Sequence, residues 1–166
     1  MTDLELTRTP GDRRLYALDG AGTLRLEGWF SRSATAEAGE QRWQIDRRGL
    51  FTATIEATDA AGTVQGEFHG RALRRGGTLR WGERELELRS SSIWRERYAL
   101  VDGERELATI EGKGWGRRPV KVTIDDAATV EPGLLLFAAF VVRALAEDAA
   151  SSAGGGAAAG GAAASG

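Results

Sequence analysis

The chain of 166 residues contains no cysteine, which excludes disulfide bonds and every cysteine-ligated metal site. Histidine is almost as scarce, because His69 is the only one. No carboxylate stands at a metal-ligand spacing from it, so we expect a strand histidine with a satisfied hydrogen bond. A serine hydrolase would need the same histidine as its base, and the serines at 90–92 look like a turn rather than a nucleophile elbow. The sequence therefore predicts no enzymatic activity, no metal and no cofactor.

An excess of positive charge is also missing. The 22 basic and 24 acidic residues give a net charge of −2, which argues against nucleic acid as a partner. Residues 1–14 are polar and lack the apolar core of a secretory signal. Arginine far outnumbers lysine, a bias typical of GC-rich bacterial genomes. We therefore expect a cytoplasmic bacterial protein.

What the sequence does have, from residue 4 to residue 124, is alternation of apolar and polar residues. This period of two is typical of strands with one buried face. Turn signals such as Asp-Gly and Gly-Gly separate the runs, so neighbouring strands are expected to be antiparallel. The small, polar segment 31–40 is interpreted as an exposed loop. Ten or eleven strands are predicted, near 4–8, 14–18, 23–30, 42–46, 51–58, 63–71, 78–81, 84–89, 93–101, 105–112 and 119–124.

The end of the chain changes character. Pro132 is well placed as the first-turn residue of a helix, and the composition predicts that helix near 132–148. Its apolar part would span roughly 20 Å, too short for about 30 Å of hydrocarbon, so no transmembrane segment is expected. No polar residue interrupts it before Arg143, and a helix that is apolar all round must be enclosed all round. Residues 149–166, rich in alanine and glycine, are predicted to be a disordered tail.

Strands and helix together predict the fold class. Many amphipathic antiparallel strands can close into a barrel, and a barrel of more than eight strands needs something inside. We predict an all-β protein: a closed antiparallel barrel of about 10–12 strands wrapped around a buried hydrophobic C-terminal helix. Residues 1–148 would form one domain.

This order of elements resembles a known superfamily. Short antiparallel strands, then residues 93–124 (IWRERYALVDGERELATIEGKGWGRRPVKVTI), a connector and a hydrophobic helix are similar to the tubby C-terminal-like superfamily. The closer branch is the LURP-one-related and phospholipid-scramblase-like one. The resemblance implies a barrel of about twelve strands around a central helix, and a function such as phosphoinositide binding. The chain lacks the acidic and cysteine-rich calcium segments of scramblase-type members.

Four pairs of adjacent arginines lie beside turn glycines. Counting the predicted connections in order places three of the pairs at one end of the barrel, with Lys113 and near Trp115, and the pair Arg13–Arg14 at the opposite end. The resulting cationic rim would suit a phosphate-bearing surface, although arginines that merely solubilise turns are the alternative. The predicted binding residues are Arg47, Arg48, Arg74, Arg75, Lys113, Arg117 and Arg118.

Other motifs favour structural roles. The tryptophans stand near strand ends, where aromatic residues commonly seal a barrel, and the alternative is contact with a ligand or a headgroup layer. Asp125 and Asp126 are adjacent, so their side chains diverge and solvation of the helix entry is expected rather than cation binding. The glycines within 111–119 precede no helix, which predicts a wide hairpin or bulge instead of a phosphate loop.

The function predicted from these observations is a non-enzymatic binding module. Its rim would recognise anionic lipid headgroups or other phosphate-bearing ligands, peripherally at a membrane surface. The alternative is a structural or protein-interaction domain with no lipid affinity. A barrel that carries a small apolar ligand is a third hypothesis, but the helix would already fill that volume.

Overall fold

The computed structural model describes residues 1–28, 32–49, 54–71, 75–113 and 116–154. Twelve antiparallel strands form a closed barrel, and each strand pairs with its neighbours in sequence. The fold class predicted from the sequence is confirmed. The strands are β1 (Thr2–Arg8), β2 (Leu15–Leu18), β3 (Gly22–Glu27), β4 (Ser33–Ala38), β5 (Gln41–Arg48), β6 (Thr54–Asp59), β7 (Val64–Gly70), β8 (Gly76–Trp81), β9 (Arg84–Ser90), β10 (Glu96–Asp102), β11 (Arg105–Gly112) and β12 (Val120–Ile124).

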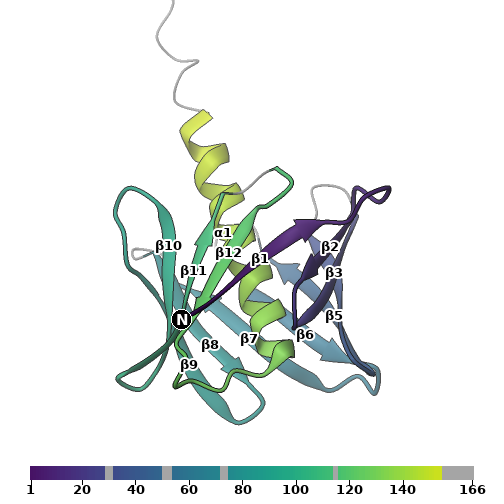
Figure 1. Ribbon diagram of the computed structural model, residues 1–166, viewed down its shortest axis with the longest axis horizontal. Coiled ribbons are helices and arrows are strands. Elements are labelled where there is room, and N and C mark those ends of the chain that lie inside the picture. The colour runs from purple at the N-terminus through teal and green to yellow at the C-terminus, as the bar shows by residue number, and fades with distance from the viewer. Residues whose placement is uncertain (29–31, 50–53, 72–74, 114–115, 155–166) are drawn as a thin grey trace, which may run out of the picture.

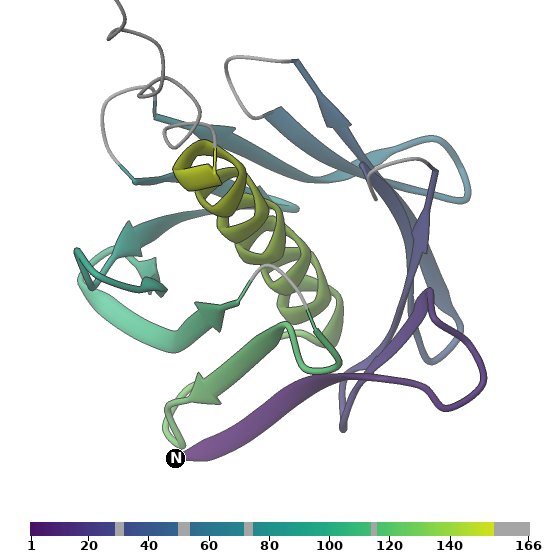
Figure 2. The same cartoon turned by 90° about the horizontal axis from the view of Figure 1, so that it is seen from above.

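The first and last strands close the barrel. In β1, Leu4 pairs with Val122 and Leu6 pairs with Val120 of β12. Because β1 also pairs with β2, every strand has two neighbours and the sheet has no open edge. Figure 1 shows β1 beside β12, and Figure 2 shows the strands surrounding the helix.

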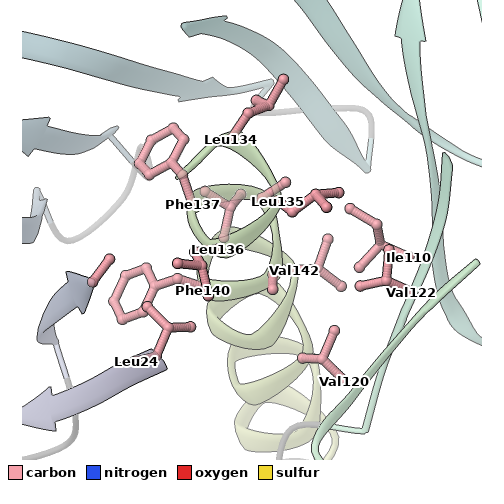
Figure 3. Close-up of a cluster of buried hydrophobic side chains, with 14 of the residues drawn as sticks. Leu24, Ile110, Val120, Val122, Leu134, Leu135, Leu136, Phe137, Phe140 and Val142 are labelled. Carbon is pink, nitrogen blue, oxygen red and sulfur yellow. The ribbon is translucent and has the colours of Figure 1, made fainter. Parts of the chain in front are cut away.

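The single helix of the described residues, α1 (Pro132–Gly154), fills the interior of the barrel (Figures 1 and 2). Every residue from Leu134 to Val142 is at most 3% exposed, so the helix has no wet face along that stretch. Burial of each large apolar side chain contributes roughly 1.5–3 kcal/mol. Figure 3 shows Phe137 and Phe140 among these side chains, with Leu24, Ile110 and Val122 of the wall close by. The helix extends to Gly154, beyond the predicted end at 148, so residues 149–154 are helical rather than part of a tail.

The sequence prediction missed one strand, β4. The segment interpreted as an exposed loop, 31–40, contains a strand in which Ala34 and Ala36 are fully buried while Thr35 and Glu37 point outward. Two alanines give a weak hydrophobic signal. Their size has a physical reason, because α1 contacts β3 and β4 closely and leaves little room for larger side chains there.

Glycines also bring the wall close to the helix. A Cβ on Gly112 of β11 would lie 3.0 Å from Val142, and one on Gly66 of β7 would lie 3.2 Å from Phe137. Both distances are tighter than ordinary van der Waals contact. The small residues of the wall therefore complement the large residues of the helix.

Two tryptophans close the barrel where the helix enters. The rings of Trp43 and Trp81 meet edge to face with centroids 5.5 Å apart, and Trp81 Nε1 donates a hydrogen bond to Glu131 Oε2 at 2.9 Å. Gly133 lies against both rings, since a Cβ there would be 2.6 Å from Trp43 and 2.7 Å from Trp81. For these two tryptophans, the predicted sealing role is confirmed.

This packing predicts that Gly133→Ala lowers the free energy of unfolding. The added methyl group must displace an indole ring, at a cost of about 1–3 kcal/mol, even though alanine is the better helix former. Urea unfolding followed by circular dichroism measures the change. Ser152→Ala, at the exposed part of the same helix, is the control and should change stability by less than about 0.5 kcal/mol. Unchanged or higher stability of Gly133→Ala would contradict the close packing.

Candidate functional site

The helix begins at one end of the barrel and leaves it at the other, and the two ends are named accordingly. We call the end at which Gly133 packs on Trp43 and Trp81 the helix-entry end. The opposite end, where Asp148 pairs with Arg47 near the end of β5, is the helix-exit end. Because the strands alternate in direction, the connections after odd-numbered strands lie at the helix-exit end and those after even-numbered strands lie at the helix-entry end.

The connections at the helix-exit end are basic. Among their described residues, Asp12 is the only acidic one, and it binds Arg25 at 2.8 Å. Ion pairing by strand residues reduces this charge but does not remove the bias within the connections. The described cations in these connections are Arg13, Arg14, Arg32, Arg71, Arg75, Arg95, Lys113, Arg117 and Arg118.

The connections at the helix-entry end are acidic and mostly short. All of them are described, and none contains lysine or arginine. Three are two-residue Gly-Glu turns, as between β10 and β11, where Gly103 has a φ of +61°. Arginines do occur at the strand ends here, but they have partners. Arg42 pairs with Glu37 and Arg84 with Asp102, while Arg105 donates a hydrogen bond to the carbonyl of Ala127. The acidic residues of the connections are Asp19, Glu40, Glu83, Glu104, Asp125, Asp126 and Glu131.

The charge separation corrects one sequence prediction. Arg13–Arg14 was expected opposite the other arginine pairs, but it lies in the connection from β1 to β2, at the helix-exit end. Omitting β4 had shifted the parity of every later connection by one. With β4 included, the connections that follow β1, β5, β7 and β11 all share one end. The predicted rim residues within the described ranges therefore do share an end, and Arg13 and Arg14 belong with them.

Individual rim residues differ in their partners. The side chain of Arg47 is only 16% exposed and makes two hydrogen bonds to the carboxylate of Asp148, so it anchors the helix to the wall. Arg48, by contrast, is exposed and lies 3.2 Å from Glu56. Of the predicted binding residues that the structure describes, Arg47 is thus the one with little exposure to solvent.

The other rim residues that the structure describes face solvent. Arg75 pairs with Glu96 and Arg118 with Glu5, at 3.1 and 3.0 Å. In the second pair both side chains are exposed, and such pairs contribute at most about 1 kcal/mol, so an incoming anion can compete for the Arg118 guanidinium. Lys113 and Arg117 are exposed, and within the described part of the chain neither forms an ion pair. Arg74 and Trp115 lie outside the described residues.

A second charged feature lies where the helix leaves the barrel. Arg143 is 6% exposed, and its Nη2 binds Glu147 Oε1 at 2.6 Å, one helical turn later. Its Nε and Nη1 are buried without a partner among the described residues. Burial raises the pKa of Glu147 above its ordinary value, because the lost hydration outweighs the attraction of Arg143. This pair is the polar end of an otherwise apolar helix.

The arrangement predicts a pH-dependent defect in Arg143→Met. Without the guanidinium, ionised Glu147 is partly buried and uncompensated, so stability at pH 7 should fall by about 1–3 kcal/mol. A carboxyl whose pKa is higher in the folded state binds protons more tightly there, so acidification from pH 7 toward 5 should restore stability. Urea unfolding at each pH measures this recovery.

The double variant Arg143→Met/Glu147→Gln supplies the control. It removes the carboxyl group, so its stability at pH 7 should exceed that of Arg143→Met and should lack the recovery on acidification. Identical pH profiles for the single and double variants would rule out Glu147 as the cause.

The other sequence candidates have structural roles or remain solvated. His69, in β7, is exposed, with its Nε2 3.5 Å from Glu67 Oε1. Asp125 Oδ1 accepts the backbone N–H of Ala127 at 2.9 Å, and Asp126 pairs with the N-terminal amine. The described residues contain no cluster of three metal-type ligands, and no described helix is long and apolar enough to cross a membrane.

Trp94 does not seal the barrel, which is the role that the sequence favoured for the tryptophans over contact with a ligand or a headgroup layer. It is 88% exposed in the connection from β9 to β10, beside Ile93 at 78%. The sequence placed both residues in a strand at 93–101, which begins instead at Glu96. The serines at 90–92 were the available signal, because they indicate a turn continuing into Ile93. Trp29 lies outside the described residues.

Comparison with known proteins adds no relative. No protein-family model, curated protein or solved structure matches this chain. The resemblance to the tubby C-terminal-like superfamily therefore stays a prediction, and the candidate surface has to be argued from its own residues.

Proposed function

We propose that this protein is a non-enzymatic module that binds anionic membrane surfaces through its helix-exit end. The observation that carries the proposal is the segregation of charge between the two sets of connections. Cations such as Arg13, Lys113 and Arg117 lie at one end, and the acidic turns lie at the other. A net charge of −2 would repel the molecule weakly from an anionic surface, but this polarity orients it with its basic end forward.

Two further features support the proposal. The helix occupies the barrel interior, so a ligand has to be bound on the outside or at an end. The connections at the helix-exit end are also longer than the Gly-Glu turns opposite, and exposed loops on a rigid scaffold commonly carry binding residues. Membership of the tubby-like superfamily, if it holds, would agree with this function.

The proposal predicts salt-dependent binding to anionic vesicles. The protein should cosediment with mixed phosphatidylcholine and phosphatidylserine vesicles at low salt, and less at about 0.15 M salt. It should not cosediment with phosphatidylcholine alone. Arg13→Gln/Arg117→Gln should weaken binding on the order of tenfold, since each basic residue near the surface contributes about 1 kcal/mol.

The matched control is Arg42→Gln/Arg84→Gln, which removes the same charge from the helix-entry end and should leave binding unchanged. Equal losses in both double variants would mean that net charge, not the basic end, drives binding. No binding of the unmodified protein under either salt condition would overturn the proposal and favour a protein-interaction domain.

A further inference from the structure

The connection between β9 and β10 exposes two large apolar side chains side by side. Ile93 is 78% and Trp94 88% exposed. Adjacent bulky apolar residues at such exposure are uncommon on a soluble surface and indicate contact with a partner or a membrane. They project from the basic helix-exit end, next to Arg95.

Hydrogen bonds hold this tip in shape. Ser92 Oγ accepts the backbone N–H groups of Trp94 and Arg95, at 3.2 and 3.1 Å. The N–H of Ser91 donates to the carbonyl of Arg97 at 2.9 Å and closes the base of the loop. The exposure of the tip therefore belongs to an ordered turn, and a preorganised tip loses less conformational entropy on binding.

A basic groove of about 840 Å³ lies beside the tip on the outer wall. Three arginines line it, two from the β7–β8 connection and one from β9, and so do the serines of the turn. The lining residues are Arg71, Arg75, Glu87, Leu88, Arg89, Ser90, Ser91, Ser92, Ile93 and Trp94.

Two carboxylates now pair with the arginines of this groove, Glu96 with Arg75 and Glu87 with the other two. Glu87 lies 3.0 Å from both Arg89 and Arg71, and these two arginines lower its pKa. Arg75 Nη1 lies 3.5 Å from the carbonyl of Ile93, which ties the groove to the tip. The three arginines outnumber these two carboxylates, so the groove keeps a net positive charge. The side chains of Arg71, Arg75 and Arg89 are 47%, 50% and 61% exposed, so a phosphate could replace Glu87 as the partner of two of them and Glu96 as the partner of the third.

We propose that this groove holds the phosphate of an anionic phospholipid headgroup while Ile93 and Trp94 insert into the membrane interface. The inference rests on the proposed function and locates its contact at the β7–β8 and β9–β10 connections. The combination favours a membrane over a protein, because tryptophan prefers the interfacial layer and the described residues of the surrounding connections include nine cations and one carboxylate. Binding thus has an apolar part, from the tip, and an ionic part, from the groove.

The two parts are separable by vesicle cosedimentation. Ile93→Ser/Trp94→Ser should weaken binding to phosphatidylserine-containing vesicles about tenfold and leave the salt dependence unchanged. Arg71→Gln/Arg75→Gln should weaken it and flatten the salt dependence. Glu87→Gln should strengthen binding severalfold, since it removes one competing carboxylate, and a gain cannot come from misfolding. Val64→Ser, at an apolar residue 38% exposed at the helix-entry end, is the control without effect.

Fluorescence reports insertion directly. Phosphatidylserine-containing vesicles with brominated acyl chains should quench the unmodified protein more than Trp94→Phe, because bromine quenches tryptophans that reach the bilayer. If the unmodified protein binds but the Ile93/Trp94 double variant binds equally well, or Trp94→Phe is quenched to the same degree, the inference is overturned and the proposed function stands. If the unmodified protein does not bind these vesicles, both fail.

Discussion

Enclosure of α1 is the constraint on which the rest of the structure depends. A helix with no polar residue between Gly133 and Arg143 cannot face water, and the twelve-stranded wall surrounds it on every side. The wall in turn depends on the helix, because a barrel of this width would otherwise be hollow. Small wall residues such as Ala36 and Gly112 are matched to its bulk. Helix and barrel therefore form one core and should unfold together.

A filled interior determines where binding can occur. The buried helix occupies the axis of the barrel, so the proposed binding surface lies on the outside, at one end. Antiparallel alternation then sorts the connections into two sets. One set contains Gly-Glu turns, and the other contains longer basic loops that surround the emerging helix. The molecule therefore has one basic end, which carries the ordered Ile93–Trp94 tip, although its net charge is only −2.

Much of the fold could be predicted from the sequence, because burial of one strand face leaves a period of two and enclosure of the helix leaves an uninterrupted apolar run. The strand Ser33–Ala38 was not predicted, because its buried residues are alanines, which give a weak alternation of apolar and polar residues. The helix leaves little space for larger side chains there. That omission put Arg13–Arg14 at the wrong end relative to the other arginine pairs. The end at which a connection lies depends on whether an odd or even number of strands precedes it, so one missed strand changes the result for every later connection. The groove at Arg71 and Glu87 was beyond sequence reasoning, because it depends on side chains of β9 meeting those of the β7–β8 and β9–β10 connections on one wall.

Native-state hydrogen exchange tests the central claim most directly. If α1 is the core of the barrel, the amides of Leu136 to Val142 should exchange only through global unfolding. Their free energy of opening should then match that of the slowest amides in the wall, such as those of β10 and β11. Exchange of the helix through a smaller opening, while the strands stay protected, would contradict the account. The helix could then leave the barrel, and the interior would become available to a ligand.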